Sequence, residues 1–510
     1  MTGPRGPRGT SAVVIGAGVG GLAAAIHLAR RGIRVTVLEK NRGPGGRLGA
    51  FSRDGHVFAT GPTLLVMPLL YRTELASLGA DFERDLEPRR VDPTYHVVFD
   101  DGARLDLTSD LAALSRQLEG FEPGATGGLL RYLDEGRRHY ELAMPNLVER
   151  DFRTAGEFLT PANAARMLRL KALTPHYRHM ARFFGSPRLR AAFSFQDLYM
   201  GLSPFTAPST FSLTPFSELA HGVWYPRDGM SRLVHVLVGL ADEAGVRFEY
   251  DEAAERIEVG GGRADGVVLA GDRLLRADVV VANADLPYVY RRLLPDRRAA
   301  QALARRRSSG SAISFFWGLD TCYPQLAPHT LFLADDYRGN FDRIERNLPL
   351  PERPSLYVHA PGRLDPGAAP AGRDTIVAVV PTGHMTYDGD DPRLSEGESQ
   401  RWATARDEAR RAVLERLALL GVTDLEEHIA VEASSTPLTW RERCNLERGA
   451  THGLAHTVTQ LAYFRPHNRH RRYGNLYFAG ASTHPGTGVP TALVSGRLAA
   501  ERVADDVGRV

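Results

Sequence analysis

Apolar and polar positions in the first forty residues follow the order of a strand, a helix and a second strand. Ser11–Ile15 is a short apolar run typical of a buried strand. Residues 21–31 are rich in alanine and fit a helix, and residues 34–39 repeat the strand pattern. This βαβ order predicts the start of a parallel sheet covered by a helix.

The middle of the chain returns to the same α/β character. We expect a helix at residues 230–244 and then a strand pair, 246–250 and 255–259, with a turn at 260–262. A further buried strand is expected at residues 277–282. Near the C-terminus, a short apolar strand leads into a turn dense in Gly and Pro and then a helix from about Thr491.

The stretches between these segments have a different pattern. Residues 86–219 are predicted to be rich in helix and contain many prolines and aromatic residues. Residues 295–450 mix strands, at 312–317 and 375–380, with a long charged helix at about 396–420. This alternation predicts one domain assembled from separated pieces, with a second domain inserted into it.

Length and composition narrow the class of protein. A chain of 510 residues is too long for one compact core, so two domains are expected. A net charge of +3 gives no reason to expect a nucleic-acid partner. Cys322 and Cys444 make neither a disulfide framework nor a metal site, which suits a reduced, cytoplasmic setting. Because no continuous apolar run reaches 18 residues, we predict no transmembrane helix.

A glycine fingerprint follows the first strand and opens the first helix. Gly16, Gly18 and Gly21 fit G-x-G-x-x-G, which permits a tight turn, close approach of a pyrophosphate and close helix–strand packing. The free N–H groups of the helix N-terminus attract the same phosphates. Glu39 ends the next strand and is placed to accept hydrogen bonds from ribose hydroxyls, with Lys40 beside it. Together they predict a dinucleotide site.

The residues after Glu39 indicate which dinucleotide binds. Pro44-Gly-Gly46-Arg47 resembles the FAD-binding fingerprint of the flavin amine oxidase superfamily, in which the Arg neutralises the pyrophosphate. Since no second fingerprint offers a place for NAD(P)H, the substrate itself is expected to reduce the flavin. Gly61, Pro62 and Thr63 are expected near the flavin ring.

This resemblance completes the predicted architecture. The fold class is α/β, with a Rossmann-like FAD-binding domain and an inserted mixed α+β substrate domain. The FAD-binding domain is expected to comprise residues 1–85, 220–294 and 451–510. The substrate and membrane-associating domain is expected to comprise residues 86–219 and 295–450.

Residues 475–490 carry a more specific resemblance. Their Asn-Leu-Tyr strand followed by Thr-His-Pro-Gly-Thr-Gly-Val-Pro resembles the signature of bacterial-type phytoene desaturases, the carotenoid desaturase family. Further stretches resemble landmarks of that family in the same order: residues 192–196, 222–229, 283–285 and 464–468. The resemblance implies flavin contacts from Gly480, Ala481, Gly488 and Val489, and adenine contacts from the backbone of Ala254.

Other flavin enzymes remain as alternatives. Ala481 stands where the wider superfamily has Asp, as expected for desaturases. Amine oxidases hold a Lys near the flavin, but the only lysines here are Lys40, next to the ribose site, and Lys171, in a basic stretch. A desaturase or oxidase of a C30 or hydroxylated carotenoid, a soluble flavin oxidase of amines or porphyrinogens, and a non-catalytic FAD-bound scaffold all stay open.

The implied substrate suggests a membrane surface. At about 0.8 kcal/mol per carbon, placing a C40 polyene in water costs on the order of 30 kcal/mol, so it should pass directly from the bilayer. Residues 163–184 alternate basic and apolar side chains, a pattern typical of an amphipathic helix on an anionic membrane or of a surface helix packed on the core. We therefore expect a cytoplasmic protein with peripheral, monotopic membrane association.

The sequence does not single out one catalytic acid or base. Desaturation sends a hydride to the flavin and releases a proton from the adjacent carbon, so the flavin carries the hard step and the protein positions the chain. His484 and Asp197 are candidates to take that proton. Equally, His484 with Pro485 could only shape the turn, and water could suffice as the base. Oxygen or a membrane quinone is expected to reoxidise the flavin.

Overall fold

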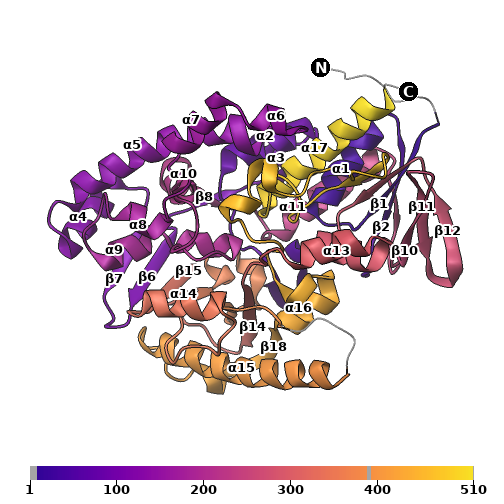
Figure 1. The fold of residues 1–510 in the computed structure, drawn as a ribbon. Coiled ribbons are helices and arrows are strands. Elements are labelled where there is room, and N and C mark those ends of the chain that lie inside the picture. Colours follow the sequence, from indigo (N-terminus) through magenta and orange to yellow (C-terminus); the bar gives the residue numbers. More distant parts are fainter. Residues whose placement is uncertain (1–8, 387–391, 509–510) are drawn as a thin grey trace.

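A computed structural model describes residues 9–386 and 392–508, so the first eight residues of the predicted FAD-binding domain lie outside it. Figure 1 shows two sheets, one near the chain termini and one beneath the centre, with a group of helices above the second. The chain passes between these regions several times.

The sheet near the termini is parallel and is built from three distant parts of the sequence. Its strands run in the order β19 (Leu476–Phe478), β13 (Val279–Ala282), β1 (Ser11–Ile15), β2 (Arg34–Leu38) and β9 (Arg247–Glu249). Helices α1 (Val19–Arg30), α11 (Ser231–Glu243) and α17 (Val489–Val507) pack together beside it. Valines from β1 and β13 and alanines from α1 form their common core.

The second sheet has seven strands in the order β18 (Ile429–Ser435), β14 (Ser311–Leu319), β17 (Thr375–Thr382), β16 (Leu356–His359), β15 (His329–Leu333), β6 (Tyr95–Phe99) and β7 (Arg104–Leu107). Its pairs are antiparallel except for β15 with β6. Helix α15 (Pro392–Ala418) covers one face, where Trp402 and Val413 join the core with Trp317. Both inserted segments of the chain therefore contribute to one sheet.

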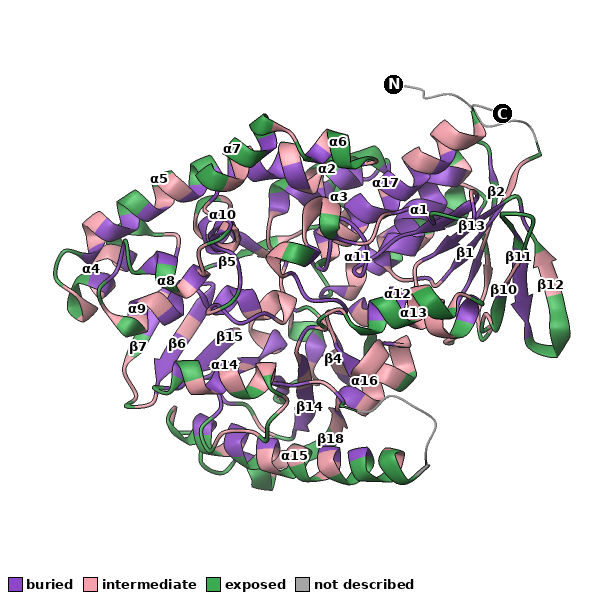
Figure 2. Cartoon of the chain, viewed as in Figure 1, coloured by how far each residue is buried: buried purple, intermediate pink, exposed green. Residues whose placement is uncertain are grey.

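Helices from residues 111–221 cover the other side of this sheet. They include α4 (Leu111–Phe121), α5 (Ala125–Ala143), α7 (Pro161–Arg169), α8 (His176–Met180), α9 (Pro187–Ala192) and α10 (Leu213–His221). Figure 2 shows that their inward faces are buried and their outward faces exposed, especially along α5 and α7. None of the helices within the described ranges is long and apolar enough to cross a bilayer.

The predicted strand pair near residue 250 is wrong. β9 lies at the edge of the parallel sheet beside β2, whereas β10 (Arg256–Gly260) pairs with β11 (Arg263–Leu269) in a three-stranded sheet completed by β12 (Arg273–Arg276). The predicted turn at 260–262 therefore connects β10 to β11. Both strands exist, but hydrophobic pattern alone does not specify which neighbour each one pairs with.

The predicted amphipathic helix over residues 163–184 is also corrected. It is divided into α7 and α8, and Lys171 between them has a left-handed backbone (φ 51°). Pro175 cannot continue a helix from Thr174, which explains the break. Leu170, Met180 and Phe184 are buried in the core, and only Leu168 and Leu173 of this stretch are exposed large apolar side chains.

Candidate functional site

One large cavity lies where the parallel sheet, the seven-stranded sheet and the overlying helices meet. Its volume is about 830 Å³. Its wall contains every residue predicted to bind the cofactor except Gly21: Gly16, Gly18, Glu39, Lys40, Gly46, Arg47, Gly61, Pro62, Thr63, Ala254, Gly480, Ala481, Gly488 and Val489. Segments separated by more than 400 residues are thus brought to one surface.

The glycine fingerprint forms a tight passage from β1 into α1. Gly16 has φ +99°, and a Cβ on Gly21 would lie 2.1 Å from the carbonyl oxygen of Gly16. Gly21 therefore lies behind the cavity wall and allows the helix to approach the strand closely. No side chain caps α1 at Gly18 and its first turn contains no acidic residue, so the helix N-terminus faces the cavity as a site for an anion.

Glu39 both lines the cavity and holds the loops around it. Its Oε2 accepts the backbone N–H of Ala17 at 2.9 Å, and its Oε1 accepts from the backbone and side-chain amides of Asn41 at 2.9 and 2.6 Å. Lys40 points its ammonium towards the Glu442 carbonyl and Asn445 Oδ1. It therefore joins the end of β2 to the last turn of α16 (Pro437–Cys444) and to the residue that follows it.

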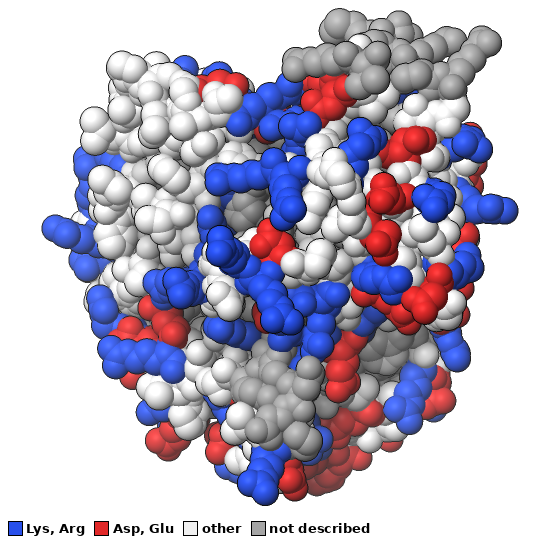
Figure 3. Space-filling view, turned by 45° about the vertical axis from the view of Figure 1, so that its right-hand side comes forward, with Lys and Arg blue, Asp and Glu red and all other residues white. Residues whose placement is uncertain are grey.

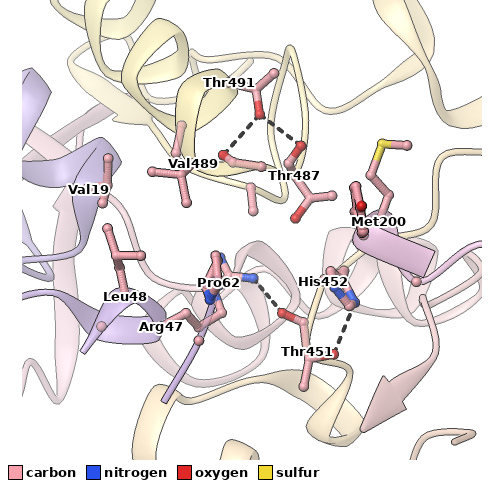
Figure 4. A pocket seen from close by; sticks show the side chains of 18 of the residues that line it. Val19, Arg47, Leu48, Pro62, Met200, Thr451, His452, Thr487, Val489 and Thr491 are labelled. Atoms are coloured by element: carbon pink, nitrogen blue, oxygen red, sulfur yellow. Dashed lines mark hydrogen bonds between the residues drawn. The ribbon is translucent and has the colours of Figure 1, made fainter. Parts of the chain in front are cut away.

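Arg47 and Pro62 lie on one side of the cavity. Arg47 Nη1 donates to the carbonyl of Thr451 at 2.9 Å, and Figure 4 shows His452 beside this pair. A Cβ on Gly61 would lie 1.8 Å from the Arg47 carbonyl oxygen, so only glycine permits that close approach. Across the open space, Val489, Thr487 and Thr491 come from the C-terminal loop and the start of α17.

The C-terminal loop meets the glycine fingerprint directly. A Cβ on Gly20 would lie 3.0 Å from the backbone nitrogen of Gly480. Asn283, which follows β13, reaches both segments: its Nδ2 donates to the Gly16 carbonyl at 3.3 Å, and its Oδ1 lies beside Gly20 and Gly480. The two motifs furthest apart in the sequence therefore build one continuous surface.

Two buried side chains hold the C-terminal loop in place. Arg465 donates to the carbonyl oxygens of Thr483 at 3.0 Å, Leu454 at 3.2 Å, Gln460 at 3.3 Å and Ala481. Asn468 Nδ2 donates to the carbonyls of Phe478 and His484, both at 3.1 Å. Burial lowers the pKa of Arg465 to about 9, which leaves it cationic at neutral pH. The landmark stretch 464–468 thus orders the loop.

The two candidate proton acceptors lie in different places. His484 lines the cavity, but its Nε2 donates to the Arg150 carbonyl at 2.8 Å and burial lowers its pKa to about 4. Asp197 is completely buried against His176 Nδ1 at 3.0 Å and is not among the residues of the cavity wall. The structure therefore brings His484 to the site and leaves Asp197 behind it.

Several residues of the cavity wall were not singled out from the sequence. His452 and His456 line it, and burial lowers the pKa of both, to about 4 for His452. Tyr95, Tyr199 and Tyr357 line its inner part. None of these residues belongs to a glycine motif, so no local pattern marked them; only the landmark stretch 192–196 pointed to the neighbourhood of Tyr199.

Comparisons with known proteins agree with this geometry. The family model "Flavin containing amine oxidoreductase" matches residues 19–504. A zeta-carotene-forming phytoene desaturase of Myxococcus xanthus is 41% identical over 97% of this chain and 94% of that protein. A 4,4'-diapophytoene desaturase of Staphylococcus haemolyticus is 34% identical over 97% of this chain and 98% of that protein. In fold, the chain is similar to putrescine oxidase bound to putrescine, with a TM-score of 0.64, 16% identity and 98% and 99% coverage.

The chain is a flavin-dependent oxidoreductase with FAD as its cofactor. It belongs to the flavin containing amine oxidoreductase family, in the group of carotenoid desaturases. The residues present fit FAD, because an uncapped helix N-terminus, a carboxylate at the end of β2 and an arginine lie along one cavity wall. The cavity extends beyond them into a region lined by Leu147 and Met167.

Proposed function

We propose that this protein desaturates phytoene to lycopene or a related product by successive hydride transfers to FAD. The observation that carries this proposal is the continuity of the cavity. It runs from the fingerprint at Gly16 and Gly18 past Thr63 to a region lined by Leu147, Met167 and other apolar side chains. A long hydrocarbon needs such a wall beside the flavin, whereas a small amine does not.

Specific residues are assigned to parts of the cofactor. Gly16, Gly18 and Arg47 would hold the pyrophosphate, and Glu39 with Lys40 would lie at the adenosine ribose, with Ala254 at the adenine. Gly46 would lie beside Arg47 at the pyrophosphate, and Gly61, Pro62 and Thr63 would lie on one side of the flavin. Gly480, Ala481, Gly488 and Val489 would lie on the other, where α17 begins with no capping side chain.

The protein's own contribution is to orient the chain and exclude water. Bound FAD supplies a two-electron acceptor for the hydride. The apolar wall holds the polyene extended and keeps water from the carbon that has lost its hydride. The absence of a lysine from this wall, apart from Lys40 at the end of β2, distinguishes the site from the amine oxidase arrangement described above.

We also propose peripheral membrane association at the outer end of the cavity. Met167 of α7 lines the cavity, while its neighbour Leu168 is 73% exposed and Leu173 is 78% exposed. Leu159 and Phe464 are also exposed, and Phe464 packs on Phe158. We call Leu159, Leu168, Leu173 and Phe464 the apolar rim.

Basic side chains support the same orientation. Arg166 and Arg169 lie in the last turn of α7 beside the apolar rim. Figure 3 shows Lys and Arg gathered in a band down the middle of one face, next to an area with few charged side chains. A membrane with anionic lipids would attract Arg166 and Arg169 while the leucines of the apolar rim enter the bilayer. A quinone in that bilayer, or oxygen, would reoxidise the flavin.

The proposed domain division follows the two sheets. Residues 9–85, 220–294 and 451–508 would form the FAD-binding domain. Residues 86–219 and 295–450, apart from those outside the described part, would form the substrate and membrane-associating domain. The site lies between them, so each domain would supply one wall.

A second candidate is a desaturase of the C30 analogue. The 34% identity to a 4,4'-diapophytoene desaturase supports this candidate. The same apolar cavity wall would also suit a shorter chain. A hydroxylated carotenoid is a further candidate substrate. A soluble oxidase of amines or porphyrinogens predicts no vesicle binding, and a non-catalytic scaffold predicts a flavin that no polyene reduces.

The test is incubation of the FAD-loaded protein with phytoene in liposomes, with and without a quinone, followed by product chromatography. We expect products with additional conjugated double bonds, and faster turnover with quinone or air than without an acceptor. The C30 analogue in parallel vesicles distinguishes the two candidates. No new conjugation from either hydrocarbon would contradict the proposed function.

A further inference from the structure

A buried carboxylate stands behind the inner part of the cavity without a cation beside it. Glu218 lies on α10 and is 4% exposed, and it forms no ion pair among the residues that the structure describes. Burial raises the pKa of Glu218 to about 7. Since buried charges are normally paired, an unpaired carboxylate near a cavity is a candidate for function.

Two tyrosines connect this carboxylate to the cavity. Tyr199 donates its hydroxyl proton to Glu218 Oε1 at 2.8 Å, and the hydroxyls of Tyr95 and Tyr199 are hydrogen-bonded to each other. Because the hydroxyl of Tyr199 donates to Glu218, its oxygen accepts the hydrogen bond from the hydroxyl of Tyr95. Tyr95 and Tyr199 both line the cavity. The chain of hydroxyls therefore runs from the cavity wall to Glu218.

This hydroxyl chain lies close to the segment assigned to the flavin ring. Thr63 follows Gly61 and Pro62, and its Oγ1 is 2.6 Å from the hydroxyl of Tyr357. The ring centroids of Tyr357 and Tyr95 are 6.5 Å apart. Thr63 and Tyr357 therefore connect the segment assigned to the flavin ring with Tyr95, which lines the same cavity.

We propose that Tyr95 takes the proton released in each desaturation and passes it through Tyr199 to Glu218, an inference that rests on the proposed desaturase function. One C–H bond of the substrate breaks with its electron pair, which reduces the bound FAD. The adjacent C–H bond breaks and leaves its pair to form the C=C bond. Its proton bonds to Tyr95 as the Tyr95 proton moves to Tyr199 and the Tyr199 proton moves to Glu218.

In this arrangement Tyr95 is the catalytic residue, and Tyr199 and Glu218 are positioning residues that act through it. The expansion of the π-system drives the carbon to lose its proton, so the relay needs only a moderate base at its end. A carboxylate that titrates near neutral pH meets this need, because proton transfer is most efficient when the base titrates near the working pH.

Other buried groups are weaker ends for the relay. His329 Nδ1 is 2.6 Å from the Tyr357 hydroxyl, but burial and neighbouring histidines lower its pKa well below the usual range. Burial lowers the pKa of His484 to about 4, and its Nε2 donates to the backbone carbonyl of Arg150. Both are poor proton acceptors at neutral pH.

Gln196 allows Glu218 to occupy both protonation states. Its Nε2 donates to Glu218 Oε2 at 3.1 Å, which suits the ionised carboxylate. Its Oε1 is buried and has no hydrogen-bond partner. If the amide rotates, this oxygen can accept from the protonated carboxyl, so neither state leaves the new proton without a partner.

The groups around Glu218 predict a single transition in rate. Tyr199 and Tyr95 face it from the segments 195–200 and 95–99, and Tyr132 faces it from α5; burial raises the pKa of all three well above the usual range. On α10 itself, His221 bonds to Ser217 and its pKa is lowered. Glu218 is thus the group whose ionisation should govern the rate near pH 7.

The test measures single turnovers of the full-length, FAD-loaded protein with phytoene in phosphatidylcholine vesicles, without oxygen, between about pH 5.5 and 8.5. We expect the wild-type rate to rise with pH through about 7 and then level off. Glu218→Gln should lower the plateau on the order of 10²-fold and remove the dependence on pH. Tyr199→Phe should lower it similarly with Glu218 intact. Tyr323→Phe changes a buried tyrosine outside the cavity wall whose hydroxyl donates to Asp424, so it should alter neither the rate nor its dependence on pH.

Separate outcomes overturn separate claims. A wild-type protein that desaturates neither phytoene nor its C30 analogue contradicts the proposed function, and the relay with it. An active wild type whose rate and pH profile survive in Glu218→Gln contradicts the relay alone. So does a higher KM with unchanged kcat, which would assign the cluster to substrate binding. Should Glu218→Gln not load FAD, Tyr199→Phe decides in the same way.

Discussion

The carboxylate of Glu39 accepts the backbone N–H of Ala17 at 2.9 Å, across the glycine turn from β1 into α1. The residue expected at the ribose therefore also fixes the loop that faces the pyrophosphate. A single side chain connects the two halves of the fingerprint.

Glu39→Ala should weaken FAD binding by about 10- to 100-fold, because hydrogen bonds to a charged group contribute about 1.5–3 kcal/mol. The effect is measured by the flavin that the protein retains after gel filtration and by titration of FAD into the apoprotein. Glu87→Ala, which removes an exposed ion pair with Arg227 instead, serves as the control and should retain wild-type affinity. Equal flavin occupancy in the two variants would exclude Glu39 from the site.

Gly21→Ala should disrupt the cofactor end of the protein even though Gly21 does not line the cavity. The added Cβ would lie 2.1 Å from the Gly16 carbonyl, so α1 must move away from β1. We expect lost flavin and a lower Tm. Gly239→Ala is the matched control, because its Cβ meets nothing within 4 Å on α11 and should raise stability by up to about 1 kcal/mol. A Gly21→Ala protein with full flavin and unchanged Tm would contradict this packing.

The apolar rim predicts vesicle binding. The double variant Leu168→Asp and Leu173→Asp should reduce binding to anionic liposomes more than tenfold, since each leucine contributes on the order of 1.5–3 kcal/mol when buried. Leu348→Asp and Leu394→Asp alter exposed leucines outside the apolar rim and should sediment like wild type. If the Leu168→Asp/Leu173→Asp protein and the Leu348→Asp/Leu394→Asp control protein sediment alike, the apolar rim is not the membrane contact.

Glu218 predicts an unusual dependence of stability on pH. Its pKa is raised from an ordinary value of 4.5 to about 7, so the folded protein holds a proton that the unfolded chain has lost. Stability from this group is fully present below about 4.5 and is lost as pH rises to about 7, by up to ~3 kcal/mol. Glu218→Gln should therefore be more stable than wild type above pH 7. Denaturant unfolding at pH 5 and pH 8 measures the free energy of unfolding of the two proteins. If the variant and the wild type differ by the same amount at both pH values, this prediction is refuted.

The parts of the fold that could be predicted depend on local signals. Ser11–Ile15, the fingerprint and Glu39 are adjacent in sequence and each has a physical role that short-range pattern reveals. The pairing of β9 with β2 and of β10 with β11 could not be predicted, because it depends on which edge each strand meets. The same holds at the site: Glu218, Tyr199 and Tyr95 come from separate elements, and only the packed structure brings them together.

Anaerobic titration of the FAD-loaded protein with phytoene in vesicles tests the central claim most directly, through the absorbance of oxidised flavin and of the polyene in one sample. The account predicts loss of the oxidised flavin band with one new double bond formed per flavin reduced. Readmitting oxygen or adding a quinone should restore the band. A flavin that stays oxidised with phytoene and with its C30 analogue, in a protein that has bound FAD fully, would contradict the account.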